Sequence, residues 1–322
     1  MQEKIIEILS SSDEYVSGQQ LSDYLGVTRQ AVWKSINSLR EKGYGIDSVT
    51  NKGYRLSSFP AYLNVGEIKR NLDTKIIGQN LAVLDTVDST NTYLKKLGSE
   101  GCKNGTVVAS REQTSGKGRL GRVWVSKKDG CLTFSFLLRP NVTLSGISAI
   151  TPLCGLAVCK AIRDFTKLDC MIKWPNDIIV GNKKLAGILT EISAEFDSVE
   201  YTVTGIGINT GQAVFDEDIA YKATSILLET GRHINNSEFL AVVLNYLEKE
   251  LVSNNLTLTS QALEEYSSMC ATVGRNVTFS RGTRKINGVA IGIDNEGELK
   301  VMLSDGSLCN VNSGEVTVQG IY

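Results

Sequence analysis

Histidine is almost absent from this 322-residue chain, which contains only His233. A single histidine excludes Ser-His-Asp and Cys-His catalysis in their usual forms, and almost any histidine-rich zinc site, unless His233 itself takes part. The seven cysteines form no C-x-x-C pair, and their odd, scattered set indicates reduced thiols and a cytoplasmic location. Any chemistry must therefore rely on lysine, arginine, aspartate and a bound metal ion. No site that holds a metal by protein groups alone is expected.

Long apolar runs are missing as well. No stretch approaches the roughly 20 apolar residues that span a bilayer, and residues 1–4 do not begin a signal peptide, so no membrane partner is expected. Charge of one sign is not in excess, since 34 Lys and Arg face 35 Asp and Glu. The composition is typical of a soluble globular protein, and the length allows two or three domains.

The first sixty residues have the pattern of a helix-turn-helix. Amphipathic spacing predicts helices over 1–12, 17–25 and 28–42, and Gly26 provides the tight turn between the last two. In the third helix, three apolar residues share the inward face at i, i+4 and i+7, and these are Val32, Ile36 and Leu39. The helix after such a turn is the one that reads DNA.

A hairpin at 46–56 follows, and the cation at its tip is typical of the wing of a winged helix. Residues 28–55 carry a net charge of +4 in a chain whose total is −1, which favours DNA over a protein partner for this domain. Trp33 lies near the polar face, where it would either contact DNA or pack against the wing. The residues expected to meet DNA are Gly18, Gln19, Gln20, Thr28, Arg29, Gln30, Lys34, Asn37 and Lys52.

After a predicted linker at 57–60, strands and helices alternate. The expected strands are 81–87, 106–110, 131–138, 171–174, 178–180, 185–193 and 199–208. The expected helices are 88–97, 145–165 with an interruption near Pro152, 237–254 and 260–269. Strand pairs joined by short turns favour an α+β fold with a mixed sheet over a doubly wound parallel one. Short strands between 277 and 319, separated by turns, predict a small β-barrel.

Residues 116–122 hold three glycines and three cations, and Trp124 follows them. The pattern G-x-G-x-x-G matches a dinucleotide fingerprint, but the next residues are too few and too turn-rich for the crossover helix which that fingerprint requires. The remaining interpretation is a mobile basic loop whose glycines allow close approach and whose cations suit phosphate, unless it is only an exposed turn.

Three further segments place polar groups at strand ends. Residues 173–177 combine a lysine, a tryptophan and an aspartate, and 184–189 place a lysine at the mouth of a strand beside a glycine. Residues 205–209 alternate two glycines, which would leave a flat floor for a planar ligand. Each segment alone has a purely structural alternative: a turn with an incidental acid, a solvated lysine with a packing glycine, or a β-bulge.

Together these segments resemble the motif series of biotin protein ligases, in order and at similar spacing. The series is D-S-T-N at 88–91, Gln113 with the glycine loop, K-W-P-N-D at 173–177, K-L-A-G at 184–187 and G-I-G-I-N at 205–209. With its winged helix, the chain is similar to the bifunctional bacterial class, in which the ligase is also the biotin operon repressor. The implied domains are a winged helix-turn-helix at 1–58, a class II synthetase-like ligase domain at 65–270 and an SH3-like β-barrel at 271–322.

The resemblance implies that biotin and ATP, with Mg²⁺, form biotinyl-5′-AMP, and that biotin then passes to a lysine of a biotin carboxyl carrier domain. It also implies a homodimer that binds operator DNA of biotin genes when the adenylate is bound. The implied biotin contacts are Ser89, Thr90, Asn91, Gln113, Gly116, Lys117, Arg119, Lys184, Gly187, Gly205 and Gly207. The implied ATP or adenylate contacts are Arg119, Arg122, Trp124, Asn176, Lys184 and Asn209. The residues expected to be catalytic are Arg119, Lys184 and Asp177.

Such a site needs no histidine. The biotin carboxylate is already ionised at pH 7, so adenylation needs positioning and charge neutralisation, for which Lys184 and Mg²⁺ are suited. Asp177 is the candidate to orient or deprotonate the acceptor lysine. Lys117 stands where the family often has arginine, which keeps the charge but loses the bidentate fork. A non-catalytic biotin-sensing repressor and a lipoate-type ligase of the same fold are the alternatives.

Overall fold

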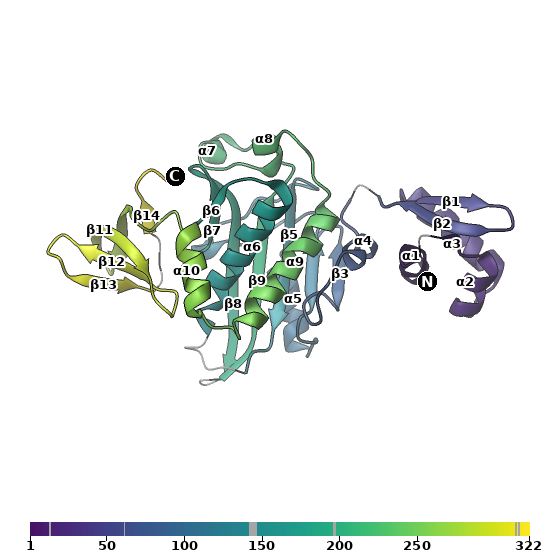
Figure 1. Cartoon of the computed structure of the whole chain (residues 1–322), viewed down its shortest axis with the longest axis horizontal. Helices are drawn as coiled ribbons and strands as arrows, with labels where there is room; N and C mark the ends of the chain where they lie inside the picture. The colour runs from purple at the N-terminus through teal and green to yellow at the C-terminus, as the bar shows by residue number, and fades with distance from the viewer. Residues whose placement is uncertain (13, 61, 142–146, 196–197, 313, 315) are drawn as a thin grey trace. The chain divides into compact units, whose positions relative to one another are not determined.

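The computed structural model describes residues 1–12, 14–60, 62–141, 147–195, 198–312, 314 and 316–322 (Figure 1). The chain divides into two compact units, Met1–Leu72 with Asn235–Ala241, and Asp73–Ile234 with Val242–Tyr322. In the part of the chain that is described, no helix combines the length and the apolar character that a bilayer span requires.

The first unit begins with three helices. They are α1 at Gln2–Ser10, α2 at Gly18–Leu25 and α3 at Arg29–Glu41. Ser17 and Gln20 form a capping box at the start of α2, and Gly26 ends that helix in the left-handed conformation that glycine adopts without strain. The Thr28 hydroxyl accepts a hydrogen bond from the third residue of α3 and caps it. The helix-turn-helix prediction is confirmed.

The core of this unit contains Val32, Ile36 and Leu39, which are buried as predicted. The hairpin consists of β1 at Gly45–Val49 and β2 at Gly53–Ser58, paired antiparallel. Phe59 packs against the same core, so residues 57–59 complete this unit where the sequence predicts a linker. A fourth helix that the sequence did not predict, α4 at Val65–Arg70, follows and contacts α1.

A seven-stranded sheet forms the centre of the second unit, in the order β3-β4-β5-β9-β8-β7-β6. The strands are β3 Leu81–Leu84, β4 Val107–Ser110, β5 Cys131–Leu138, β6 Cys170–Lys173, β7 Asp177–Val180, β8 Lys183–Glu195 and β9 Ser198–Asn209. Among these described strands, β3 and β4 pair in parallel and every other neighbouring pair is antiparallel. The prediction of a mixed sheet is confirmed.

Helices accompany this sheet, and Figure 1 shows α6, α9 and α10 in front of it. The helices are α5 Thr90–Ser99, α6 Ile150–Thr166, α7 Glu217–Ala220, α8 Ile226–Thr230, α9 Asn236–Ser253 and α10 Ser260–Met269. The predicted interruption near Pro152 is wrong, because α6 begins at Ile150 and a proline in the first turn removes no helix hydrogen bond. Residues 145 and 146, where the sequence starts this helix, lie outside the described residues.

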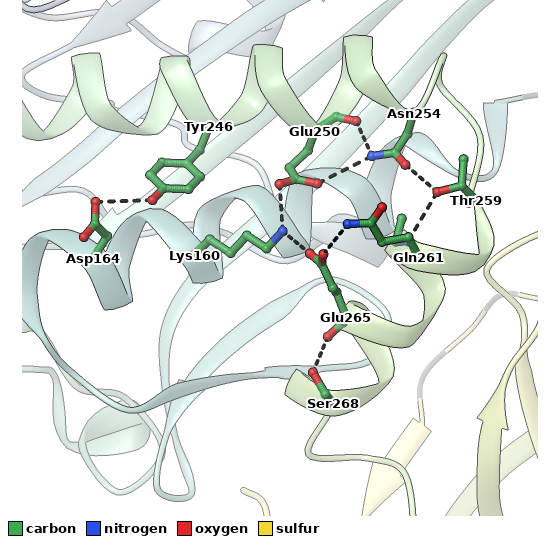
Figure 2. Close-up of polar contacts among 10 residues, drawn as sticks. Lys160, Asp164, Tyr246, Glu250, Asn254, Thr259, Gln261, Glu265 and Ser268 are labelled. Atoms are coloured by element: carbon green, nitrogen blue, oxygen red, sulfur yellow. Dashed lines mark hydrogen bonds and ion pairs between the residues drawn. The ribbon is translucent and has the colours of Figure 1, made fainter.

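A polar network joins three of these helices (Figure 2). Lys160 of α6 forms ion pairs with Glu250 of α9, at 2.8 Å, and with Glu265 of α10. Glu250 is buried, so the lysine compensates a carboxylate that has lost its water. The Tyr246 hydroxyl of α9 donates to a carboxylate oxygen of Asp164 on α6 at 3.2 Å. The network therefore connects α6, α9 and α10 to one another.

A five-stranded antiparallel sheet follows α10, in the order β13-β12-β11-β10-β14. Its strands are β10 Asn276–Arg281, β11 Arg284–Ile293, β12 Leu299–Leu303, β13 Leu308–Val311 and β14 Val316–Val318. These are the strands predicted for the C-terminal segment. The indole N–H of Trp174 donates to the Gly297 carbonyl at 2.9 Å and connects this sheet to the end of β6.

Candidate functional site

The segments singled out in the sequence meet above the middle of the seven-stranded sheet, where β9 lies between β5 and β8. The start of α5 and the loop before β5 provide the remaining walls of one cavity. The predicted biotin and nucleotide contacts that line this cavity are Ser89, Thr90, Asn91, Gln113, Lys117, Arg119, Trp124, Asn176, Lys184, Gly187, Gly205 and Gly207. Side chains from five separate stretches of sequence therefore share one space.

The base of the cavity is a glycine floor, made of Gly187, Gly205 and Gly207. β9 pairs with β5 without a break across this stretch, so the β-bulge alternative is wrong. A Cβ atom added at Gly205 would lie 2.1 Å from Asn91 Oδ1, and one at Gly207 would lie 2.4 Å from the Trp124 indole. The glycines are thus required for close approach, and the occupant of the floor is an indole of the chain itself. A planar ligand on this floor would require the indole to move.

One wall of the cavity is a chain of hydrogen bonds at the start of α5. Both the backbone N–H and the hydroxyl of Thr90 donate to Gln113 Oε1, at 2.8 and 3.0 Å. Ser135, fully buried on β5, donates to Thr90 Oγ1 at 2.7 Å and lies 2.6 Å from Asn91 Oδ1. Ser135 was not among the residues expected from the sequence, although a serine among the apolar residues of β5 is a signal of an inward polar contact.

Behind Asn91 lies Glu191 of β8, which was not among the residues expected from the sequence and which lines a neighbouring hollow along the glycine-rich loop. Its carboxylate accepts from Asn91 Nδ2 at 2.8 Å and pairs with Lys95 Nζ at 2.8 Å. Burial disfavours the charged form of Glu191, but the hydrogen bonds from Lys95 and Asn91 and the charge of Lys117 outweigh it and lower its pKa. An ionised carboxylate therefore orients the Asn91 amide. Glu191 follows Gly187 at a period of two along β8, so it shares that face of the strand.

The glycine-rich loop is an irregular hairpin. The Trp124 N–H donates to the Gly116 carbonyl and the Gly118 N–H to the Arg122 carbonyl, both at 2.8 Å. A Cβ atom at Gly116 would lie 2.4 Å from the Trp124 carbonyl oxygen, so this glycine allows close approach of the two strands. At the tip, the short 3₁₀ segment Arg119–Gly121 contains Leu120 in the left-handed conformation, at φ 56°, and this residue is 71% exposed. Mobility of the loop stays a prediction.

The three residues predicted to be catalytic lie close together. Arg119 turns inward from the loop and donates to Asn176 Oδ1 at 2.8 Å and to the Gly314 carbonyl at 3.1 Å. Lys184 Nζ lies 2.6 Å from Asp177 Oδ1 and 5.6 Å from the ring centroid of Trp124. Two cations and a carboxylate thus surround the edge of the glycine floor, an arrangement suited to a phosphate-containing ligand.

Three predicted contacts lie beside this cavity. The side chain of Asn209 is buried, donates to the Thr224 carbonyl at 2.9 Å and lies next to the Cys131 thiol. Gly116 and Arg122 line a second hollow along the loop, together with Glu191. Periodicity correctly places Asn209 at the end of β9, but it does not reveal that the amide is used inside the fold.

The exposed face of α3 is the candidate DNA-binding surface. Arg29, Gln30 and Lys34 are exposed there, and Trp33 on the same face is 54% exposed. This exposure favours a surface contact for Trp33 over packing against the wing. Lys52 is exposed at the tip of the hairpin.

Some predicted DNA contacts are used within the fold. The side chains of Gln20 and Thr28 cap helices, and Gln19 donates to Asp23 at 2.7 Å. Among the nearby cations, Arg40 donates from Nε and Nη2 to the Ile46 carbonyl, at 3.0 and 2.7 Å. Arg55 pairs with Asp47 at 3.0 Å. The exposed surface therefore presents fewer cations to DNA than the net charge of residues 28–55 indicates.

Comparisons with known proteins agree with this geometry. Residues 83–209 match the biotin/lipoate A/B protein ligase family, residues 1–55 an HTH domain, and residues 272–318 the biotin protein ligase C terminal domain. The bifunctional ligase/repressor BirA of Bacillus subtilis is 35% identical over 312 residues, which are 95% of each chain. The one from Escherichia coli is 29% identical over 98% of this chain and 96% of its own.

Among solved structures, a biotin protein ligase from Aquifex aeolicus in complex with biotin and ATP has a TM-score of 0.65 and 31% identity. The match covers 75% of this chain and 99% of that one. The Bacillus subtilis relative is thus more than 30% identical along nearly its whole length. The match extends from the helix-turn-helix to the C-terminal sheet. The chain therefore belongs to the family of biotin protein ligases, in the group of bifunctional ligase/repressors.

Proposed function

We propose that this chain is an ATP-dependent ligase that converts biotin to biotinyl-5′-AMP, transfers biotin to a lysine of a biotin carboxyl carrier protein, and represses biotin genes. The observation that carries the proposal is the cavity over the glycine floor, where Arg119, Lys184 and Asp177 converge beside a wall of neutral hydrogen-bonding groups. The thiols of the seven cysteines are all free, which supports a cytoplasmic location.

In the first step, an oxygen of the biotin carboxylate attacks the α-phosphorus of ATP. The new O–P bond replaces the bond to pyrophosphate, which leaves. We assign the polar wall of Thr90, Asn91 and Gln113 to biotin, because neutral donors and acceptors suit an uncharged polar head group. Lys184 and Arg119 neutralise the charge that builds up on the phosphates.

Mg²⁺ belongs to this proposal as an ion that arrives with the triphosphate. The described residues contain no cluster of three or more acidic, cysteine or histidine side chains able to hold a metal. Mg²⁺ keeps several waters and is commonly bound by substrate phosphates with one or two carboxylates. Asp177 is the carboxylate near Lys184 that could share in holding it, and the bound ion would supply further neutralisation of the phosphates.

In the second step, the acceptor lysine loses one proton to Asp177 and its nitrogen attacks the acyl carbon of the adenylate. A C–N bond forms, the C–O bond to the phosphate breaks, and AMP leaves as the second nitrogen proton passes to water. An ordinary carboxylate is a weak base for an ammonium, so orientation of the lysine is the larger part of this role.

For repression, we propose that the adenylate-bound chain forms a homodimer. A two-fold pair of winged helices would place two α3 helices in successive major-groove half-sites of an operator. Arg29, Gln30 and Lys34 of α3 and Lys52 of the wing supply the exposed groups for phosphate and base contacts.

The test of the enzymatic claim is incubation of the purified chain with biotin, ATP, Mg²⁺ and a carrier domain. We expect intact-mass spectrometry to show one biotinyl group on the carrier lysine. Adenylate without a labelled carrier would favour a biotin-sensing repressor. Isothermal titration with biotin and with lipoate separates the two ligand classes, and tighter binding of lipoate would overturn the assignment to biotin.

A further inference from the structure

Tyr322 contacts the candidate catalytic carboxylate, although no motif drew attention to it. Its hydroxyl donates to Asp177 Oδ2 at 2.5 Å. Lys173 Nζ lies 3.7 Å from the centroid of the Tyr322 ring. The backbone N–H of Tyr322 donates to the Asn182 carbonyl at 3.4 Å. The preceding residue, Ile321, is buried and hydrogen-bonded back to β14. The tyrosine is therefore held at its ring, its backbone and its hydroxyl.

The two oxygens of Asp177 consequently have different partners. Oδ1 lies 2.6 Å from Lys184 Nζ, whereas Oδ2 accepts from Tyr322. Lys184 lines the cavity, so a phosphate group bound there competes with Asp177 for its ammonium. Lys184 can leave Oδ1 in this way, while the Tyr322 hydroxyl continues to hold Oδ2.

We propose that Tyr322 is a positioning residue for biotin transfer, which holds Asp177 so that Oδ1 receives the ammonium of the acceptor lysine after Lys184 has turned to the phosphate. This inference rests on the proposed function. A carboxylate held at one oxygen has lost most of its rotation about χ2, so less freedom remains to be lost when the acceptor docks.

The protonation of the pair fits this role. A phenol keeps its proton at pH 7, so the Tyr322 hydroxyl is a donor to Asp177 Oδ2. A donated hydrogen bond stabilises the ionised carboxylate and does not make it a stronger base. Tyr322 therefore acts through the direction in which Asp177 presents Oδ1.

The experiment separates the two half-reactions in the full chain carrying Tyr322→Phe. Adenylate formation is followed by pyrophosphate release, and transfer by mixing the preformed adenylate complex with carrier domain in a single turnover. We expect adenylate formation to stay within about twofold of wild type and transfer to slow by about tenfold, the loss of one hydrogen bond to a charged group. Equal slowing of both steps would mean a merely structural role and would overturn the proposal.

Tyr246→Phe is the matched control, because it also removes a tyrosine hydroxyl from an aspartate, in the helical layer of Figure 2. We expect it to leave both half-reactions unchanged. In the Asp177→Asn background, Tyr322→Phe should add little, whereas a full additional tenfold loss would show that the tyrosine acts elsewhere.

The outcomes also distinguish this inference from the proposed function. If wild type transfers biotin and Tyr322→Phe transfers equally fast, only the role of Tyr322 is overturned. If wild type forms no adenylate, the proposed function fails, and the role of Tyr322 fails with it.

Discussion

The α3 surface and the ligand cavity are built in opposite ways. The groups on α3 and the wing come from two neighbouring stretches and are exposed. The groups around the glycine floor come from Ser89 to Tyr322 and, apart from Lys117, are at least partly buried; many of them form connected hydrogen bonds and ion pairs. Substitutions on the first surface should therefore act separately and depend on salt, whereas those in the cavity should be coupled to one another.

The largest effect is expected from Arg29→Ala combined with Lys34→Ala on the α3 surface. Operator affinity should fall by about 100-fold at low salt, and the slope of log affinity against log salt should decrease by about 2. Fluorescence anisotropy over a salt series measures both quantities. Lys4→Ala, which removes an exposed cation from α1, is the control and should change little. If the double variant lost carrier biotinylation as strongly as operator binding, the α3 surface and the ligand cavity would not act independently.

Arg119→Ala is expected to have the next largest effect, in the cavity. The side chain is held by Asn176 and the Gly314 carbonyl at the edge of the glycine floor, so its loss removes charge-assisted bonds from the adenylate. Adenylate should dissociate about 30-fold faster, while the affinity for biotin alone changes little. A chase of radiolabelled adenylate measures the rate. Lys117→Ala, from the exposed side of the loop, should have a smaller effect, and the reverse order would contradict the assignment.

Trp33→Ala should weaken operator binding by about tenfold through loss of an apolar contact with base edges. Because no charge is removed, the salt dependence should stay as in wild type. Trp33→Phe should retain most of the affinity. If operator and unrelated DNA lose affinity equally, Trp33 contributes to general binding and not to sequence recognition.

The smallest effect is expected from Glu191→Gln, which removes a charge from behind Asn91. The folded protein holds the pKa of Glu191 below its ordinary value of 4.5, so this contribution to stability is present above that value and is lost as the pH falls through the lower folded value. At pH 7 the variant should be less stable by about 1 kcal/mol. Urea unfolding at pH 7 and at pH 3 should show a smaller difference between the variant and wild type at pH 3.

Local patterns were sufficient for the winged helix because its caps and apolar face lie within single elements. Ser17, Gly26 and Thr28 act where the sequence places them. The inward turn of Arg40 toward Ile46 was not predictable, because charge alone does not show which cations hold the hairpin to the helix.

In the cavity, periodicity placed Gly187, Gly205 and Gly207 on the right strands but did not show what lies against them. Glu191 and Tyr322 were missed because the order of strands decides which residues they meet. β7 and β8 are neighbours, which brings Asp177 opposite Gly187. The contact of Tyr322 with Asp177 crosses 145 positions of sequence and leaves no local signal.

The Trp124 indole lies against the glycine floor, so a ligand that binds on this floor has to compete with a side chain of the protein itself. Its Nε1–H is buried without a hydrogen-bond acceptor among the described residues, so the placement is not fixed by a polar contact. A ligand that needs the floor binds only the fraction of molecules whose indole has moved, and its apparent Kd rises in inverse proportion to that fraction. A preference of about 1.4 kcal/mol for the floor would weaken biotin tenfold. A ligand large enough to stack on the displaced indole would recover part of that loss, which predicts a larger affinity gap between adenylate and biotin than their contacts alone would give.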